Sequence, residues 1–227
     1  MWKHLARLFV SNTCYGCDNE LTIQERCICL DCLSQIEETQ FHSTPDTNEL
    51  YYRLAGRVPL AGASALFYFD KGGRLQKIIQ QLKYDSAPQI GTFLGAHYGK
   101  ILQDTPFIKQ SDVILPVPLH FIRHQSRGYN QAERFAKGMA QISGIPVKTN
   151  LLQRVRRTKY QAKQLGTARW ENVKGAFKVK GSLPERILLL DDVITTGATI
   201  GSCLESLYES STPPKEVRIM CIGMTRQ

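Results

Sequence analysis

The segment 186–199, Arg-Ile-Leu-Leu-Leu-Asp-Asp-Val-Ile-Thr-Thr-Gly-Ala-Thr, constrains the fold of this 227-residue chain more than any other. Its apolar run, 187–190, is typical of a strand buried on both faces of a parallel sheet. Two carboxylates, Asp191 and Asp192, follow where we expect that strand to end. A turn of small and hydroxyl-bearing residues, 195–199, then leads into an expected helix. The pattern predicts a strand–turn–helix unit of an α/β protein.

The same segment has the chemistry of a sugar phosphate site. Carboxylates at a strand end can accept hydrogen bonds from the vicinal hydroxyls of a sugar. Backbone N–H groups, threonine hydroxyls and the positive end of a helix dipole favour a phosphate. Together they indicate a ribose 5-phosphate group, although an ordinary strand followed by a helix-capping Asp-Asp turn is the alternative. The residues predicted to bind are Asp191, Asp192, Thr195, Thr196, Gly197, Ala198 and Thr199.

This segment also resembles the 5-phosphoribosyl 1-pyrophosphate (PRPP) signature of type I phosphoribosyltransferases. The resemblance implies that the acidic pair contacts the ribose 2- and 3-hydroxyls and that the turn holds the 5-phosphate. It also implies Mg²⁺ bound together with PRPP. The segment does not match a Walker A loop, because no Gly-Lys-Ser/Thr follows a glycine-rich turn.

Five of the seven cysteines lie between positions 14 and 32. Cys14 and Cys17 form one C-x-x-C pair, and Cys29 and Cys32 form a second after 11 intervening residues. Four thiolates satisfy tetrahedral zinc and leave no open coordination position, so we predict a closed structural site. Cys27 is a spare thiol that is an alternative to Cys29.

Two other interpretations of these cysteines are a disulfide cluster and a redox dithiol. No secretory signal is recognised at the N-terminus, so stable disulfides are not expected. A thioredoxin-like pair needs one C-x-x-C in a βαβ setting, which this segment lacks. The two remaining cysteines, Cys203 and Cys221, lie in apolar surroundings and are expected to be buried bystanders.

The charge of the chain is unevenly distributed. The net charge is +9, yet residues 120–181 hold 14 Lys and Arg against two acidic residues. Such a basic region favours an anionic partner, either a phosphorylated ligand or nucleic acid, and a merely solvated basic face is the alternative. No apolar run approaches the roughly 20 residues of a membrane span. We expect a cytoplasmic protein, and a peripheral position at the inner membrane is the alternative.

The order of elements predicts the architecture. We expect a zinc module over residues 1–40, a polar linker over 39–48, and a second domain over 41–227. Strands alternate with helices in that domain, which implies a parallel sheet with flanking helices and ligands beyond the carboxyl ends of its strands. A polar basic loop is expected after Leu119 and a long mobile loop over 156–172. The strands are expected at 64–69, 113–119, 147–155, 186–190 and 216–223, and the helices at 74–83, 89–102, 130–142 and after the turn.

Several further segments resemble the ComF family of competence-associated proteins (the ComFC/GntX type). They are the basic loop 120–131, Pro116-Val-Pro118 before it, Leu82-Lys83-Tyr84, and the four-cysteine module. Scattered positions agree as well: Arg154, Gln161, Leu165, Arg169, Asn172 and Phe177. The resemblance implies a type I phosphoribosyltransferase-like fold, a pyrophosphate contact near Arg123 and Arg127, and a flexible hood over 156–169. It also implies a role in natural transformation, with incoming single-stranded DNA and the DNA-uptake machinery as partners.

Three functional hypotheses follow. The first is a PRPP-binding protein that aids single-stranded DNA uptake, and the second is an active phosphoribosyltransferase with an unidentified acceptor. The third is a zinc-ribbon nucleic-acid binder with a vestigial ligand site. No catalytic residue is assigned, because no acceptor pocket is recognisable in the sequence. Aromatic residues among the basic ones suit base stacking. Tyr129 and Phe177 are instead expected in the core. The candidate DNA contacts are Phe121 and the loop residues Lys159, Tyr160, Arg169 and Trp170.

Overall fold

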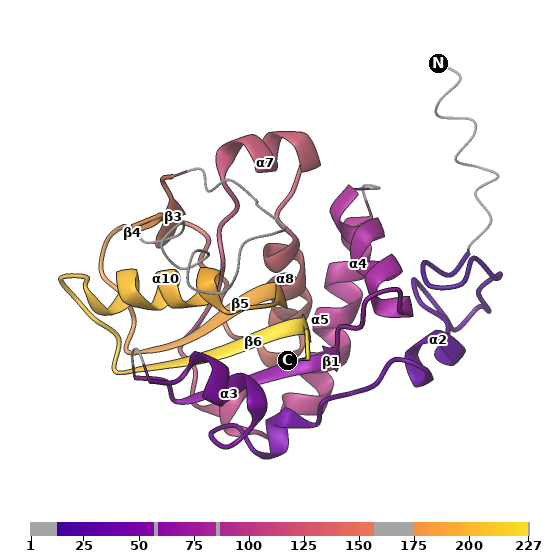
Figure 1. The fold of residues 1–227 in the computed structure, drawn as a ribbon, viewed down its shortest axis with the longest axis horizontal. Coiled ribbons are helices and arrows are strands. Elements are labelled where there is room, and N and C mark those ends of the chain that lie inside the picture. Colours follow the sequence, from indigo (N-terminus) through magenta and orange to yellow (C-terminus); the bar gives the residue numbers. More distant parts are fainter. Residues whose placement is uncertain (1–12, 57–58, 85–86, 157–174, 227) are drawn as a thin grey trace.

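A four-stranded sheet forms the centre of the molecule (Figure 1). The computed structural model describes residues 13–56, 59–84, 87–156 and 175–226. The strand order is β1-β6-β5-β2, and each neighbouring pair is parallel. The expected α/β class with a parallel sheet is confirmed. In chain order the elements are α2 (Leu30–Ser34), η2 (Phe41–Ser43), α3 (Glu49–Leu54), β1 (Gly62–Tyr68), α4 (Arg74–Tyr84), α5 (Pro88–Leu102), α6 (Pro106–Lys109), β2 (Val113–Pro116), α7 (Phe121–Arg127), α8 (Gln131–Ser143), β3 (Leu152–Arg154), β4 (Phe177–Val179), β5 (Arg186–Ile194), α10 (Ala198–Tyr208) and β6 (Glu216–Met224).

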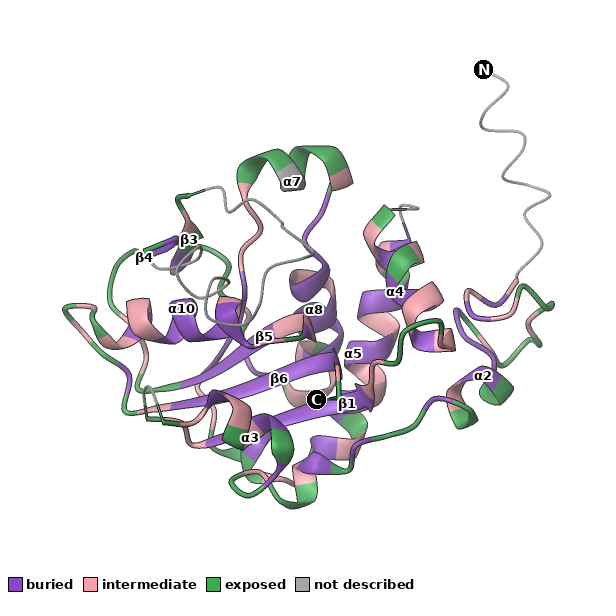
Figure 2. Ribbon diagram, viewed as in Figure 1, coloured by how far each residue is buried: buried purple, intermediate pink, exposed green. Residues whose placement is uncertain are grey.

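The two faces of the sheet are buried against different helices, because successive side chains of a strand point in opposite directions. Leu188 and Leu190 belong to one apolar cluster, which includes residues of α4, α5 and α8. Ile187 and Leu189 belong to a second cluster, with residues of α3 and α10. Figure 2 shows the strands as buried throughout their centre. A strand covered on both faces explains why segment 187–190 is continuously apolar.

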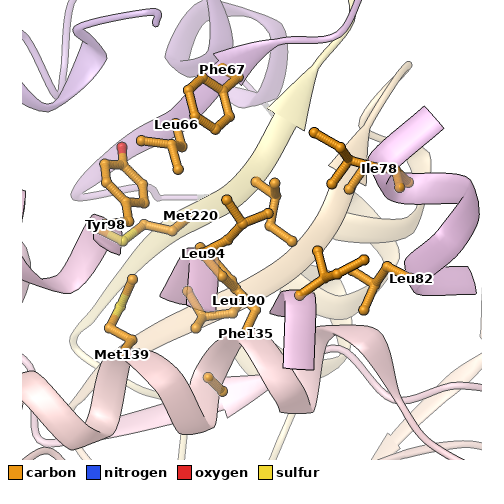
Figure 3. Close-up of a cluster of buried hydrophobic side chains, with 14 of the residues drawn as sticks. Leu66, Phe67, Ile78, Leu82, Leu94, Tyr98, Phe135, Met139, Leu190 and Met220 are labelled. Carbon is orange, nitrogen blue, oxygen red and sulfur yellow. The ribbon is translucent and has the colours of Figure 1, made fainter. Parts of the chain in front are cut away.

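Helices α5 and α8 make the closest helix contact of the first cluster. Gly95 of α5 lies so near α8 that an added Cβ would be 2.0 Å from the carbonyl oxygen of Phe135. Gly138 of α8 makes the reciprocal approach to the carbonyl oxygen of Thr92. Leu94, Phe135 and Leu190 meet in the cluster that these helices form with the sheet (Figure 3). Small residues therefore let the backbones of α5 and α8 approach closely. The N-cap of α8, Asn130, donates to the carbonyl oxygen of Val117 and so places the start of α8 beside the end of β2.

Three expectations about connecting segments were wrong. The basic loop after Leu119 contains the helix α7, which is capped by the His120 side chain and ends at Gly128 with φ 75°. The strand expected at 147–155 is interrupted: Val147 forms a single parallel bridge with Ile114 of β2, and the short β3 pairs antiparallel with β4 outside the central sheet. The polar segment 39–48 is not a free linker, because Thr39 donates its backbone N–H to Leu66 and its hydroxyl to Ala65.

The cysteine module packs directly on α4. Ile28 and Cys32 belong to the same buried cluster as Ile78 of that helix. Lys77 of α4 also forms an ion pair of 2.6 Å with Asp18 of the module. The boundary near residue 40 stays a prediction, and within the described residues the module and the sheet share one apolar core.

Candidate functional site

The carboxylates of Asp191 and Asp192 lie where β5 loses one of its two neighbours. Pairing with β2 stops at Leu190, opposite Pro116, whereas pairing with β6 continues to Ile194. The strand therefore extends two residues beyond the acidic pair, further than the sequence suggested. One side of this extension has no strand partner among the described residues. It faces the connection between β2 and α7, at the carboxyl edge of the parallel sheet where ligands bind in such folds.

Asp191 has a strongly perturbed carboxyl group. Burial is the main cause that raises its pKa to about 7, and the charge of Asp192 is the second. The backbone N–H of Asp192 and the charges of Lys83 and Arg154 lower the pKa but do not outweigh these two causes. The N–H of Asp192 donates to Asp191 Oδ1 over 2.8 Å. A half-buried carboxyl group with a pKa near neutrality is frequent at functional sites.

Asp192 is held by a cation from another element. Lys83 Nζ, in the last turn of α4, lies 3.0 Å from Asp192 Oδ2. Both side chains are largely buried, with 23% and 16% of their surfaces exposed. The N–H of Val193 also donates to Asp192 Oδ1 over 2.6 Å. Sequence analysis noticed Lys83 only as part of a resemblance and did not place it at the acidic pair.

The turn after β5 has the geometry expected of an anion site. Gly197 is the N-cap of α10 and adopts φ 77°, a left-handed conformation that glycine adopts without strain. Thr195 is exposed and Thr196 and Thr199 are half-buried, so their hydroxyls are accessible. Arg53 of α3, which sequence analysis missed, donates from Nη1 to the Thr195 carbonyl oxygen over 2.7 Å. This hydrogen bond holds the turn in place. The first backbone N–H groups of α10 have no partner within the helix and can therefore donate to a ligand.

Helix α7 brings a basic residue to the same edge. The guanidinium of Arg127 lies over the Tyr84 ring, 5.2 Å from its centroid, and donates to Gln131. Tyr84 directly follows Lys83, so Arg127 and the acidic pair approach the same end of α4. The backbone of Arg123 lies in α7, but the orientation of its side chain lies outside the described structure. Lys159, Tyr160, Arg169 and Trp170 also lie outside the described residues.

A cavity of about 240 Å³ opens between the end of β2 and the helices α7 and α8. Its walls carry two side chains able to exchange protons, His124 and Glu133, and neither Asp191 nor Asp192 lines it. The other residues of its wall are Pro116, Pro118, Leu119, Asn130 and Thr149. The cavity thus lies beside the β2–α7 connection, and no residue of β5 lines it.

The four predicted zinc ligands converge. The Sγ atoms of Cys14, Cys17, Cys29 and Cys32 all lie within 4.8 Å of one another. Tetrahedral zinc with Zn–S bonds of about 2.3 Å needs sulfur atoms about 3.8 Å apart, and the Cys17 and Cys29 sulfurs are 3.7 Å apart. The N–H groups of Gly16 and Cys29 donate to the Cys14 sulfur, and such donors stabilise thiolates. The residues present fit structural zinc.

Cys27 is separate from this cluster. Its side chain is buried, and burial raises the pKa of its thiol to about 11. Burial also acts to raise the pKa of Cys14, but backbone donors from Cys29, Gly16 and Cys17 outweigh it and bring that pKa to about 7. The four-sulfur cluster contains Cys29 and not Cys27, so the geometry favours Cys29 as the zinc ligand. Cys203 and Cys221 are fully buried, as expected of bystanders.

The aromatic residues divide between core and surface. Tyr129 and Phe177 are buried, as expected of core residues. Phe121 of α7 is 67% exposed, and Tyr84, which sequence analysis did not consider as a stacking residue, is 70% exposed. Figure 2 shows α7 as an exposed helix above the sheet. Both exposed rings therefore lie on elements that border the acidic pair.

Comparison with known proteins extends this description. Competence protein F of Haemophilus influenzae is 28% identical over 206 residues, which cover 85% of this chain and 89% of that protein. The chain is a homologue of competence protein F. The resemblance to the ComF family is confirmed. No protein-family model matches the sequence.

Two other proteins are also similar to this chain. DNA utilization protein YhgH of Escherichia coli K12 is 26% identical over 67% of this chain and 69% of that protein. Competence protein ComFC of Streptococcus pneumoniae is 33% identical over 41% of this chain and 40% of that protein. Among the described residues, no helix combines the length and apolar character needed to cross a membrane.

The solved structures that resemble this chain have lower sequence identity to it than these relatives. Adenine phosphoribosyltransferase of Leishmania tarentolae covers 79% of this chain and 88% of its own, with 14% identity and a TM-score of 0.35. The enzyme of Leishmania donovani gives 14% identity and a TM-score of 0.34.

Proposed function

We propose that this protein binds PRPP with Mg²⁺ at the acidic end of β5 and acts on single-stranded DNA in natural transformation. The single observation that carries the ligand is the strand–turn–helix itself. It joins two carboxylates to a turn in which Gly197, at φ 77°, begins α10. Carboxylates suit the ribose hydroxyls and the helix start suits the 5-phosphate. Mg²⁺ accompanies the pyrophosphate in this proposal because it binds adjacent phosphates well.

The role in transformation is supported by the names of the relatives. Proteins called competence protein F and DNA utilization protein align over 85% and 67% of this chain. The side chains near the candidate site also suit an anionic polymer as a ligand. The exposed Tyr84 ring lies under the Arg127 guanidinium, and the exposed Phe121 ring is on the same helix as Arg127. Stacking on aromatic rings with nearby cations is how single strands are bound without sequence preference. The net charge of +9 favours the same partner.

An active phosphoribosyltransferase is the second candidate. The observation in its favour is the cavity of about 240 Å³ between β2, α7 and α8, beside the β2–α7 connection. His124 and Glu133 in its wall are suited to accept a proton from an incoming nucleophile. In such a reaction the C1–pyrophosphate bond breaks, the nucleophile bonds to C1, and pyrophosphate leaves with the bonding electrons.

Calorimetric titration of PRPP with MgCl₂ tests the ligand. We expect saturable binding to the wild type and its loss in Asp191→Ala/Asp192→Ala, with unchanged zinc content. Asp104→Ala is the control, because its carboxylate is 82% exposed and pairs only with Lys109 among the interactions described. Equal binding by wild type and double variant, or no binding by the wild type, would reject the proposal. Pyrophosphate release that depends on an added acceptor would favour the transferase.

Oligonucleotide binding against salt tests the DNA partner. Each phosphate neutralised on a single strand lowers log K by about 0.7 per tenfold rise in salt. We expect a steep slope for the wild type and weaker binding for Tyr84→Ala/Phe121→Ala, since each stacked base contributes about 1–3 kcal/mol. Tyr52→Ala is the matched control, because this ring is 64% exposed on α3. A flat salt response would remove DNA from the proposal.

A further inference from the structure

Lys83 has a fixed backbone, and its ammonium group is held only by the side chain's ion pair with Asp192 among the interactions described. The carbonyl oxygen of the preceding residue, Leu82, accepts hydrogen bonds from the Tyr129 hydroxyl and from Gln131 Nε2. The following residue, Tyr84, contacts the Arg127 guanidinium. Neighbours on both sides therefore hold this turn of α4 against α7 and α8. Only the flexible four-carbon stem of Lys83 can change its direction without moving the helix.

The partner of Lys83 is the carboxylate that a ribose needs. Lys83 Nζ lies 3.0 Å from Asp192 Oδ2 in a largely buried position. A sugar hydroxyl that donates to Asp192 Oδ2 shares that oxygen with Lys83 and weakens the ion pair. If the ammonium group were left without an anion there, the loss would be large, because an unpaired buried charge is strongly unfavourable. A ligand that brings its own anion to the site avoids that loss, since Lys83 then exchanges one anionic partner for another.

We propose that Lys83 is a specificity-determining residue, which leaves Asp192 when ribose hydroxyls bind there and pairs with the phosphate that the ligand carries at C1. This inference rests on the proposed binding of PRPP at the acidic pair. It explains why the site holds a cation where a sugar is expected. It also predicts a preference: ribose carrying pyrophosphate at C1 binds better than ribose 5-phosphate, and Lys83 is the source of much of the difference.

The test compares two ligands and four proteins. PRPP and ribose 5-phosphate, each with MgCl₂, are titrated into wild type, Lys83→Met, Lys83→Arg and Lys77→Met. Lys77 is the matched control because it lies on the same helix but pairs with Asp18 of the cysteine module. Melting temperature and zinc content confirm that each variant is folded. Ribose 5-phosphate has the sugar and the 5-phosphate but no group at C1, so the ratio of the two affinities reports the C1 phosphate alone.

We expect Lys83→Met to lower the ratio of PRPP to ribose 5-phosphate affinity by roughly tenfold or more, as for a lost charge-assisted hydrogen bond. Lys83→Arg should keep a preference between that of wild type and Lys83→Met, and Lys77→Met should match the wild type. An unchanged ratio in Lys83→Met, or equal loss for both ligands, would overturn the inference and leave the proposed function in place. Failure of the wild type to bind PRPP would instead reject the proposed function itself.

Discussion

Arg74 donates from Nη1 to the Sγ atom of Cys32 over 3.0 Å, joining the first turn of α4 to the cysteine cluster. The same helix ends at Lys83 and Tyr84, beside Asp192 and Arg127. One helix of 11 residues thus contacts both the cysteine cluster and the candidate ligand site. Four thiolates on one zinc ion leave a net negative charge, and a guanidinium at hydrogen-bond distance partly offsets it.

Replacing Arg74 tests this outer contact. We expect Arg74→Met to lower zinc affinity by about tenfold, the lower end of the effect of losing a group that hydrogen-bonds a metal ligand. Competition with a chromophoric chelator measures the affinity. Arg26→Met is the control, because Arg26 is exposed in the same module and its replacement removes the same charge. Equal losses in the two variants would show a general charge effect and contradict a role for the Arg74–Cys32 contact.

The choice between neighbouring cysteines gives a second prediction. Cys29→Ser should reduce bound zinc well below one ion per chain, because Cys29 belongs to the four-sulfur cluster. Cys27→Ser should keep one zinc ion per chain, because the Cys27 thiol is buried away from the cluster. Metal analysis of the purified variants measures the stoichiometry. The reverse pattern would mean that Cys27 is the ligand.

The elements that sequence analysis predicted well are those with a strong local signal. Helix α4 has apolar residues at helical spacing, and all four of them, Leu75, Ile78, Ile79 and Leu82, are buried. The two C-x-x-C pairs identified the cysteine cluster because their spacing alone limits how the sulfurs can meet. Helix α7 was missed because it packs little of its surface: Phe121 and Ile122 are exposed, so no apolar period appears in its sequence.

The candidate site was only half predictable, for a physical reason. Asp191, Asp192 and the turn are contiguous, so one motif contains them. Lys83 and Arg53 reach this motif from α4 and α3, and Arg53 is 142 residues away from the carbonyl that it contacts. Nothing in the local sequence of α3 distinguishes Arg53 from a solvated arginine. Such residues become visible only when the topology brings the ends of distant elements together.

The carboxyl group of Asp191 should make stability depend on pH. Burial, followed by the charge of Asp192, raises its pKa to about 7, whereas an unfolded aspartate has a pKa of about 3.9. The folded protein therefore keeps this proton to a higher pH than the unfolded chain. Its contribution to the free energy of unfolding is present below about pH 4 and is lost as the pH rises toward 7.

Asp191→Asn should remove this dependence. The difference in melting temperature between Asp191→Asn and wild type should rise from pH 5 to pH 8, because only the wild type must ionise a buried carboxyl group. The corresponding free-energy slope is at most about 1.4 kcal/mol per pH unit. Calorimetric melting across this range measures it, with Asp104→Asn as the exposed control. A pH-independent difference would contradict the raised pKa.

The contact between α5 and α8 gives the last prediction, which concerns how the sheet edge is positioned. In Gly95→Ala the new Cβ would lie 2.0 Å from the Phe135 carbonyl oxygen and 2.9 Å from the Met139 backbone nitrogen. Backbone atoms cannot rotate away, so the helices must separate. We expect a loss of about 3 kcal/mol or more in the free energy of unfolding, well above the gain of about 1 kcal/mol from replacing glycine in a helix.

Gly99→Ala is the matched control, since it makes the same substitution one turn further along α5. Its Cβ would lie 3.1 Å from the Cβ of Ile142, a contact that a small shift relieves, whereas the 2.0 Å contact of Gly95→Ala requires a large one. Urea unfolding should therefore show a smaller loss for Gly99→Ala than for Gly95→Ala. Equal effects would indicate that helix propensity, and not the close approach of α5 to α8, governs stability here. Because α8 begins beside the end of β2, Gly95→Ala should also weaken PRPP binding, whereas Gly99→Ala should leave it nearly unchanged.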